Sequence, residues 1–334
     1  MQLEFSFIIP VYNRPEEVQE LLNSFLTLKT VVPFEIVLVE DGSSLTSEEI
    51  VANYKNRLNI SYFFKPNTGP GDSRNYGMAR ANGNYFIILD SDCILPQDYL
   101  QAVCDSLNEE FVHCFGGPDA AHSSFTNLQK AIDFAMTSFL STGGIRGKSY
   151  SVDKFQPRSF NMGISKEAFL ATQGFGTIHP GEDPDLTIRL WKKGFKTKLI
   201  PNAKVFHKRR ISLSKFYKQV HKFGLVRPIL NSWHPETAKI TYWFPTVFIF
   251  GFFVATITFV LGFKWLLLLY ATYFILFFIS ALVKTKNLLV ALQALLAVTV
   301  QFAGYGWGFL KSTFFVTLLK RKPEIQFPQL FFKN

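Results

Sequence analysis

The sequence predicts an α/β domain, with a mostly parallel sheet and helices on both of its faces, followed by C-terminal transmembrane helices. In residues 3–90, apolar runs of strand type alternate with segments whose apolar residues recur at helical spacing. Further along, three long stretches carry no charged residue: Trp243–Phe263, Trp265–Val283 and Asn287–Leu310. A hydrocarbon core about 30 Å thick takes about 20 helical residues to cross, so each stretch is close to or above that length.

The elements of the α/β part are predicted in order along the chain. The predicted strands cover Leu3–Val11, Phe34–Glu40, Ile60–Phe64 and Tyr85–Asp90. The predicted helices cover Pro15–Leu28, a segment starting at a capping box formed by Thr46 and Glu49, and about Ser73–Ala81. Ligands of such sheets bind at the carboxyl ends of the strands, so the short polar motifs that follow the strands are the candidate site.

The composition excludes two classes of protein. The net charge is +10, but residues 241–334 hold eight basic residues and one acidic residue, so most of the excess lies between and after the apolar stretches. This distribution argues against a nucleic-acid-binding protein. A hydrophobic share of 48% excludes a disordered chain. The three cysteines form no C-x-x-C pair and are predicted to be reduced, buried thiols.

Four segments are expected along the chain: an α/β domain over 1–215, an amphipathic interfacial segment over 216–240, two or three transmembrane helices over 241–310 and a basic C-terminal tail over 311–334. The N-terminal residues lack the pattern of a signal peptide, which predicts that the α/β domain stays in the cytoplasm. Two crossings would return Lys284 and Lys286 to the inside, whereas a third would place Lys320–Lys322 outside. The third stretch therefore either crosses the membrane or forms a re-entrant or surface-lying segment.

Polar motifs follow three of the strands. Asp90 and Asp92 come directly after a strand and could together face Mg²⁺ or Mn²⁺, although a lone D-x-D is also common in turns. Asp41 lies in an E-D-G-S-S sequence that either meets a ribose or base edge or forms an ordinary turn. Arg74 follows a Gly-Pro-Gly loop at the start of a helix, which suits a pyrophosphate.

No G-x-G-x-x-G or G-x-x-x-x-G-K-[ST] motif occurs in this loop, which argues against dinucleotide dehydrogenases and P-loop proteins. Further along, Glu182 and Asp183 open a helix, where acidic residues are also ordinary partners of the helix dipole. His207 could be a metal or phosphate ligand, or a structural histidine.

Taken in order, these motifs resemble the family 2 glycosyltransferases with the GT-A fold, of the membrane-anchored bacterial type. The resemblance covers roughly residues 3–225. The matching residues are Pro10-Val11-Tyr12-Asn13, Glu40-Asp41-Gly42-Ser43-Ser44, Arg74-Asn75, Asp90-Ser91-Asp92, Asn161-Met162-Gly163, Glu182-Asp183 and His207.

The resemblance implies a role for each residue in a metal-dependent, inverting transfer of a hexosyl or related sugar. Asp183 is expected to be the catalytic base, with Glu182 tuning its basicity. The metal, Mg²⁺ or Mn²⁺, is expected on Asp92 and Asp90, with His207 as a further ligand. The donor nucleotide is expected on Pro10, Tyr12, Asn13, Asp41, Arg74 and Asp90. The acceptor side is expected at Asn161, Met162 and Gly163.

The expected function is transfer of a sugar from a nucleotide-sugar donor to a lipid-linked or membrane-proximal glycan, in cell-surface polysaccharide or glycolipid biosynthesis. The expected location is the inner membrane, multi-pass, with the catalytic domain in the cytoplasm. Processive synthesis is disfavoured because Gln219–Phe223 departs from the Q-x-x-R-W pattern. The alternative is a non-catalytic, sugar-nucleotide-binding membrane scaffold of a polysaccharide assembly complex. A transporter is disfavoured because the three apolar stretches contain no ionisable residue.

Overall fold

The computed structural model describes residues 2–120, 125–143, 155–207 and 212–332, and these residues form two compact units. The α/β unit comprises Met1–His122, Ser151–Lys208 and Phe331–Asn334. The helical unit comprises Ser123–Tyr150 and Arg209–Leu330. The units are therefore interleaved in sequence, whereas the sequence predicted domains that follow one another.

The α/β unit contains a seven-stranded sheet in the order β3-β2-β1-β4-β8-β6-β9. All neighbouring pairs are parallel except those made by β8, which is antiparallel to both β4 and β6. The strands are β1 Phe5–Val11, β2 Phe34–Asp41, β3 Ile60–Lys65, β4 Tyr85–Leu89, β6 Cys114–Gly116, β8 Asn161–Ser165 and β9 Thr197–Leu199. The mostly parallel sheet predicted from the alternating pattern is confirmed.

Alternate residues of the central strands face two different layers of helices. Phe7 and Ile9 of β1 belong to one apolar core with residues of α1, α2 and α4, whereas Ile8 belongs to a second core with residues of α3, α7 and α8. The helices are α1 Pro15–Phe25, α2 Glu48–Ala52, α3 Pro70–Arg80, α4 Tyr99–Glu109, α7 Lys166–Thr172 and α8 Glu182–Lys192. Burial on both faces explains why β1, β2 and β4 are almost continuously apolar in sequence.

Two helix starts differ from the predictions. The prediction that a capping box at Thr46 and Glu49 starts the helix is wrong. Helix α2 begins at Glu48 after Ser47, whose side chain makes no capping hydrogen bond. The backbone N–H of Ser47 instead donates to Glu40 Oε2 at 3.2 Å, which fixes this turn from the end of β2. Helix α3 begins at Pro70 rather than near Ser73, because Gly69 takes φ +97° and leads directly into the helix.

A small second sheet has the order β5-β10-β7. Its strands are β5 Cys93–Ile94, β7 Asp119–Ala120 and β10 Val205–His207. β10 runs antiparallel to β5, with His207 opposite Cys93, and parallel to β7. This sheet brings the backbone of His207 beside the segment that directly follows Asp92.

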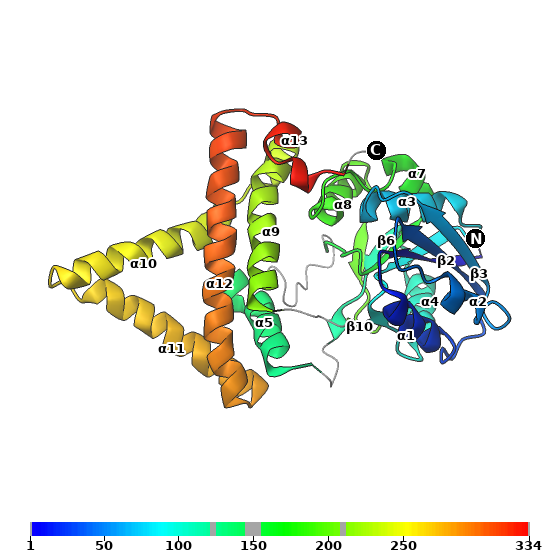
Figure 1. Ribbon diagram of the computed structural model, residues 1–334, viewed down its shortest axis with the longest axis horizontal. Helices are drawn as coiled ribbons and strands as arrows, with labels where there is room; N and C mark the ends of the chain where they lie inside the picture. Colours follow the sequence, from blue (N-terminus) through cyan, green and yellow to red (C-terminus); the bar gives the residue numbers. More distant parts are fainter. Residues whose placement is uncertain (1, 121–124, 144–154, 208–211, 333–334) are drawn as a thin grey trace. The chain divides into compact units, whose positions relative to one another are not determined.

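The helical unit is built around α12, which packs against α5, α9, α10 and α11. Figure 1 shows α9 and α12 side by side and α10 and α11 joined in a hairpin. The helices are α5 Asn127–Thr137, α6 Phe139–Thr142, α9 Leu213–Trp233, α10 Phe244–Val260, α11 Trp265–Thr285, α12 Leu288–Ser312 and α13 Pro323–Gln326. A π-helical turn, Thr313–Leu318, continues α12, and short 3₁₀ turns cover Pro235–Thr237, Ile240–Trp243 and Pro328–Leu330.

Within the part of the chain that the structure describes, three helical segments are long and apolar enough to cross a membrane: Ile240–Val260, Trp265–Thr285 and Leu288–Leu318. Their mean hydropathies are 2.0, 2.4 and 1.8. The first two expose large apolar side chains along their length, including Phe253 and Leu269. The third stretch is helical without a break, so its G-Y-G-W-G sequence does not interrupt it.

The glycines of that sequence allow other helices to approach α12 closely. A Cβ on Gly304 would lie 2.7 Å from Val220 Cγ2, and one on Gly308 would lie 2.3 Å from the His221 carbonyl oxygen, so both glycines face α9. A Cβ on Gly306 would lie 3.0 Å from the backbone of Pro245, at the start of α10. The motif is therefore a packing surface, of the kind that small residues provide between membrane helices.

We expect the full-length chain to stay in the membrane fraction at about 1 M salt, because burial of apolar helices does not depend on charges that salt screens. Membrane pellets washed with increasing salt and probed for the chain measure this. A control variant that replaces Lys215, Lys218 and Lys222 of α9 with Gln should remain equally attached. Release of the wild-type chain by salt, or its recovery in the supernatant without detergent, would contradict membrane insertion.

Candidate active site

The candidate site lies at the carboxyl ends of β1, β2 and β4. Asn13, just after β1, adopts φ +54° and joins the first two strand ends. Its Oδ1 accepts hydrogen bonds from the backbone N–H groups of Ser44 and Leu45, both at 2.9 Å, and its own N–H donates to Ser43 Oγ at 2.8 Å. Beside it, Tyr12 leaves 53% of its surface exposed, which makes its ring available to a ligand.

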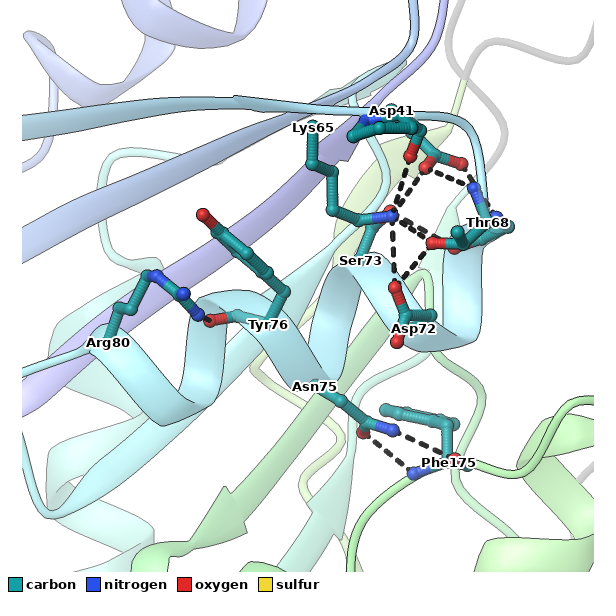
Figure 2. A network of polar contacts seen from close by, with 11 residues as sticks. Asp41, Lys65, Thr68, Asp72, Ser73, Asn75, Tyr76, Arg80 and Phe175 are labelled. Carbon is teal, nitrogen blue, oxygen red and sulfur yellow. Dashed lines mark hydrogen bonds and ion pairs between the residues drawn. The ribbon is translucent and has the colours of Figure 1, made fainter. Parts of the chain in front are cut away.

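Asp41, at the end of β2, holds the loop that leads into α3. Asp41 Oδ1 accepts from Lys65 Nζ at 2.7 Å and from the backbone N–H of Thr68 at 3.0 Å, and Oδ2 accepts from the N–H of Gly69 at 3.0 Å. Figure 2 shows Lys65 pointing toward Asp41, Thr68 and Asp72. The carboxylate predicted to meet a nucleoside is thus buried, and it fixes the Gly-Pro-Gly turn at the start of α3.

Arg74, on the second turn of α3, joins two acidic motifs that lie far apart in sequence. Its Nη2 donates to Asp90 Oδ1 at 2.9 Å, and its Nη1 donates to Glu182 Oε1 at 3.2 Å. The guanidinium is buried and lies 5.3 Å from the centre of the Phe175 ring. Its Nε is buried without a hydrogen-bond partner among the described residues. Arg74 therefore binds two protein carboxylates here, whereas the sequence predicted that it binds the phosphates of the donor.

Glu182 and Asp183 open α8 with different electrostatic surroundings. Burial opposes ionisation of Glu182, but His179 and Arg74 outweigh this effect and lower the pKa of its carboxyl. His179 Nδ1 lies 2.8 Å from Glu182 Oε1. Glu182 is therefore a permanent negative charge beside Asp183 at neutral pH.

Burial, followed by the negative charge of Glu182, raises the pKa of Asp183 to about 6. Arg74, Arg158 and a hydrogen bond from Ser159 act in the opposite direction and are outweighed. One carboxylate oxygen, Oδ1, is buried without a hydrogen-bond partner among the described residues. A carboxylate with a raised pKa and an unused acceptor atom has the properties of a general base.

Asp90 and Asp92 are the residues that could hold a divalent cation. Asp92 pairs with Arg14, which precedes α1, so both carboxylates have guanidinium partners. No group of three or more His, Cys, Asp or Glu side chains suited to a metal occurs among the described residues. Two carboxylates nevertheless fit Mg²⁺, which proteins usually hold through one or two carboxylates together with substrate phosphates. The backbone of His207 lies opposite Cys93, and its side chain lies outside what the structure describes.

The three residues predicted on the acceptor side are internal to the sheet. Asn161, in β8, accepts from Tyr99 Oη at 2.6 Å and donates to the Ala203 carbonyl at 2.7 Å. Met162 is fully buried in the apolar core, and a Cβ on Gly163 would lie 1.9 Å from the Phe115 ring. In this structure their side chains support β8 and do not reach the surface. Pro10 lies within β1, paired with Val39 of β2.

Several residues of the site were not found from the sequence. Arg14, Lys65 and His179 each pair with an acidic residue that was predicted, at separations of 78, 24 and 3 residues. Asn75 was named from the sequence only as part of the Arg74-Asn75 match, without a role. Its Nδ2 donates to the Phe175 carbonyl at 2.9 Å and so joins α3 to the segment before α8. Only the close spacing of His179 and Glu182 could have indicated its pair in advance.

The fold and the order of these motifs agree with comparisons to known proteins. Residues 6–169 match the family model described as glycosyl transferase family 2, and this match includes the strand ends that carry Asn13, Asp41 and Asp90, together with Arg74 of α3. The segment is a family 2 glycosyltransferase domain. Glu182 and Asp183 lie beyond the matched residues, and they join the site through Arg74.

Curated relatives match parts of the chain. An uncharacterised glycosyltransferase of Rickettsia conorii is 40% identical over 98 residues, 29% of this chain and 16% of that protein. A Campylobacter jejuni protein named GalNAc(5)-diNAcBac-PP-undecaprenol beta-1,3-glucosyltransferase is 26% identical over 193 residues, 57% of this chain and 60% of that protein. The match to the first relative thus spans about one sixth of its length.

A solved structure has a fold similar to that of this chain. A mannosyltransferase from Pyrobaculum calidifontis, solved in complex with GDP-Man and Mn²⁺, superimposes with a TM-score of 0.60. The similarity covers 96% of this chain and 89% of that one, at 15% identity. At this identity the likeness describes the fold alone.

We expect Lys65→Met to destabilise the α/β unit by about 3 to 5 kcal/mol, because it leaves the buried Asp41 carboxylate without its ammonium partner. Asp72→Asn is the control, since the Asp72 side chain is 42% exposed and its loss should cost about 1 kcal/mol or less. Denaturant unfolding of both variants in the full chain measures the difference. Equal midpoints for the two variants would contradict the structural role given to the Asp41 pair.

Proposed function

We propose that this protein is an inverting glycosyltransferase that moves a sugar from a nucleotide-sugar donor to a lipid-linked or membrane-proximal glycan acceptor. The observation that carries the proposal is the pairing of Glu182 with Asp183, tied by Arg74 to the Asp90 motif at the end of β4. This arrangement supplies a base of raised pKa and a strand-end acidic pair within one unit. The family 2 match of residues 6–169 gives the reaction class.

In the proposed reaction, the donor nucleotide binds at the ends of β1 and β2. The exposed ring of Tyr12 is suited to contact a base, and Asn13 keeps the two strand ends together beneath it. Asp41 contributes by holding the Gly-Pro-Gly turn, whose backbone lies at the start of α3. When the donor binds, Arg74 either keeps its contacts with Asp90 and Glu182 or exchanges one of these carboxylates for a phosphate of the donor.

Asp183 performs the proton transfer of the reaction. Its carboxylate accepts the proton of the acceptor hydroxyl as that oxygen forms a bond to the anomeric carbon, while the bond from this carbon to the nucleoside diphosphate breaks. Attack from the face opposite the leaving group inverts the configuration. Glu182 keeps Asp183 basic by its negative charge.

Mg²⁺ or Mn²⁺ held by Asp90 and Asp92, with His207 as a candidate ligand, would offset the charge that develops on the departing diphosphate. Arg14 and Arg74 then act as the counter-charges of these two carboxylates in the absence of the cation.

A membrane-bound acceptor is supported by the three apolar helices and by the Campylobacter relative, whose name specifies an undecaprenol-linked acceptor. We propose that the chain is a multi-pass protein of the inner membrane, with its α/β unit in the cytoplasm, working in cell-surface polysaccharide or glycolipid biosynthesis. The competing proposal is a scaffold that binds a sugar nucleotide without catalysis. A scaffold needs no base, so the surroundings of Asp183 favour the enzyme.

We expect Asp183→Asn to lower the transfer rate by about 10² to 10⁴-fold with saturating donor, because the amide cannot accept the hydroxyl proton. In the wild type the rate should fall as the pH drops below about 6, where Asp183 becomes protonated. Glu182→Gln removes the neighbouring negative charge, lowers the pKa of Asp183, and should shift this acidic limb to lower pH. Initial rates from pH 4.5 to about 8.5 test both variants.

Donor binding, measured in parallel, should change by less than about threefold in Asp183→Asn, since the base faces the acceptor. An Asp183→Asn enzyme with nearly wild-type rates excludes this residue as the base. Wild-type protein that binds a donor but neither transfers nor hydrolyses any nucleotide sugar favours the scaffold.

We expect Asp92→Asn to weaken metal-dependent donor binding by at least about tenfold, because it removes one of two carboxylate ligands. Arg14→Gln is the matched control: it removes the guanidinium partner of Asp92 but keeps the carboxylate, so metal-dependent binding should persist. Calorimetric titration of the donor with Mg²⁺, with Mn²⁺ and with EDTA measures this. If EDTA does not change the affinity of the wild-type protein for the donor, the assignment of a metal to Asp90 and Asp92 is wrong.

A further inference from the structure

Residues Phe331 and Phe332 lie in the α/β unit, although they follow the helical unit in sequence. Phe331 forms an isolated antiparallel bridge with Ile178, and the backbone N–H of Phe332 donates to the Thr177 carbonyl at 3.1 Å. The segment is thus fastened by backbone contacts to the loop that precedes α8. It lies outside the residues matched by the family model.

The ring of Phe332 lies close to two parts of the candidate site, the start of α3 and His179. A Cβ on Gly69 would lie 2.3 Å from two of its ring carbons, so the ring rests directly on the glycine that begins α3. The centre of the Phe332 ring also lies 6.0 Å from that of the His179 ring. Phe332 and His179 also line one small cavity together with Thr68, Asp72 and Asn75.

His179 is the residue that connects this ring to the proposed base. Its side chain is 40% exposed, and among the described residues its Nδ1 contacts Glu182 Oε1 at 2.8 Å. An imidazole exposed to this degree can rotate out of such a contact unless a neighbour limits it. The ring of Phe332 is that neighbour.

We propose that Phe332 is a positioning residue of the active site, which holds His179 against Glu182 and thereby sets the environment of Asp183. The proposal rests on the proposed function for its kinetic consequence. Asp183 faces Glu182 on its own helix, Arg74 from α3, and Arg158 and Ser159 from the segment before β8. When His179 no longer donates to Glu182, the charge of Glu182 is less offset and protonation of Asp183 becomes easier.

The kinetic experiment uses the full-length chain in detergent or in nanodiscs, with five variants: Phe332→Ala, Phe332→Tyr, His179→Ala, the double variant of Phe332→Ala with His179→Ala, and Ile325→Ala as an exposed control. Phe332→Ala should lower kcat by about tenfold, which corresponds to the loss of one hydrogen bond to a charged group. It should also move the acidic limb of the pH–rate profile to higher pH. His179→Ala should produce the same two effects. Phe332→Tyr keeps the ring and should resemble the wild type, as should Ile325→Ala.

The double variant decides whether Phe332 acts through His179. If it does, Phe332→Ala should have no further effect when His179 is already Ala. An equal loss in both backgrounds, or a Phe332→Ala enzyme with kcat within about twofold of wild type and an unmoved acidic limb, would overturn the proposal. Phe332→Tyr guards against a general folding defect, because a ring at this position should restore both values.

A second measurement needs no turnover. Modification of His179 by diethyl pyrocarbonate, followed at the peptide level by mass spectrometry, should be several-fold faster in Phe332→Ala than in wild type, with His113 as the internal standard. Unchanged modification of His179 would overturn the inference and leave the proposed function intact. If His179 is modified faster in Phe332→Ala but the wild-type protein has no transferase activity, the contact between Phe332 and His179 is supported and the proposed glycosyltransferase function is refuted.

Discussion

The buried guanidinium of Arg74 is the interaction on which the arrangement of the site depends. It contacts Asp90 at the end of β4 and Glu182 at the start of α8, which are 92 residues apart in sequence. A buried cation is tolerated only when it is paired, and removal of one partner from a buried pair costs about 3 to 5 kcal/mol. The position of α8 relative to the strand ends is therefore coupled to the ionised state of both carboxylates.

Other features of the α/β unit keep Arg74 in place. Asp41 fixes the turn before α3, Gly69 supplies the positive φ that lets the helix begin there, and Asn75 binds the Phe175 backbone on the far side. The helix thus arrives at the site with its start and its middle both held. A helix bound at two points positions a side chain more rigidly than a loop does, and the geometry of a proton transfer requires such rigidity.

Local sequence patterns predicted most of the fold but few of the contacts within the site. The strands before residue 90 and the three apolar helices follow from continuous hydrophobic runs, which depend little on context. The pairs of Arg14 with Asp92 and of Lys65 with Asp41 depend on which strands are neighbours in the sheet, and no local pattern encodes that. Asn161–Gly163 were assigned to the acceptor from a motif, whereas an antiparallel strand between β4 and β6 buries them. The α/β domain predicted over 1–215 also included Asn127–Thr137, which forms α5 and belongs to the helical unit.

The placement of α5 has a consequence for the order in which the chain is made. Phe134 of α5 packs against Phe277 of α11 at 5.2 Å between ring centres, and Ala131 and Ile132 share a core with residues of α12. A ribosome releases α5 before β8 exists and long before α11 and α12 emerge. During that interval its apolar face lacks its partners on α11 and α12, and an apolar face without its partners is prone to aggregation. Assembly of the helical unit is therefore a late event of synthesis. The two parts of the α/β unit that flank α5 in sequence, Met1–His122 and Ser151–Lys208, are made before the helices that α5 packs against, α11 and α12.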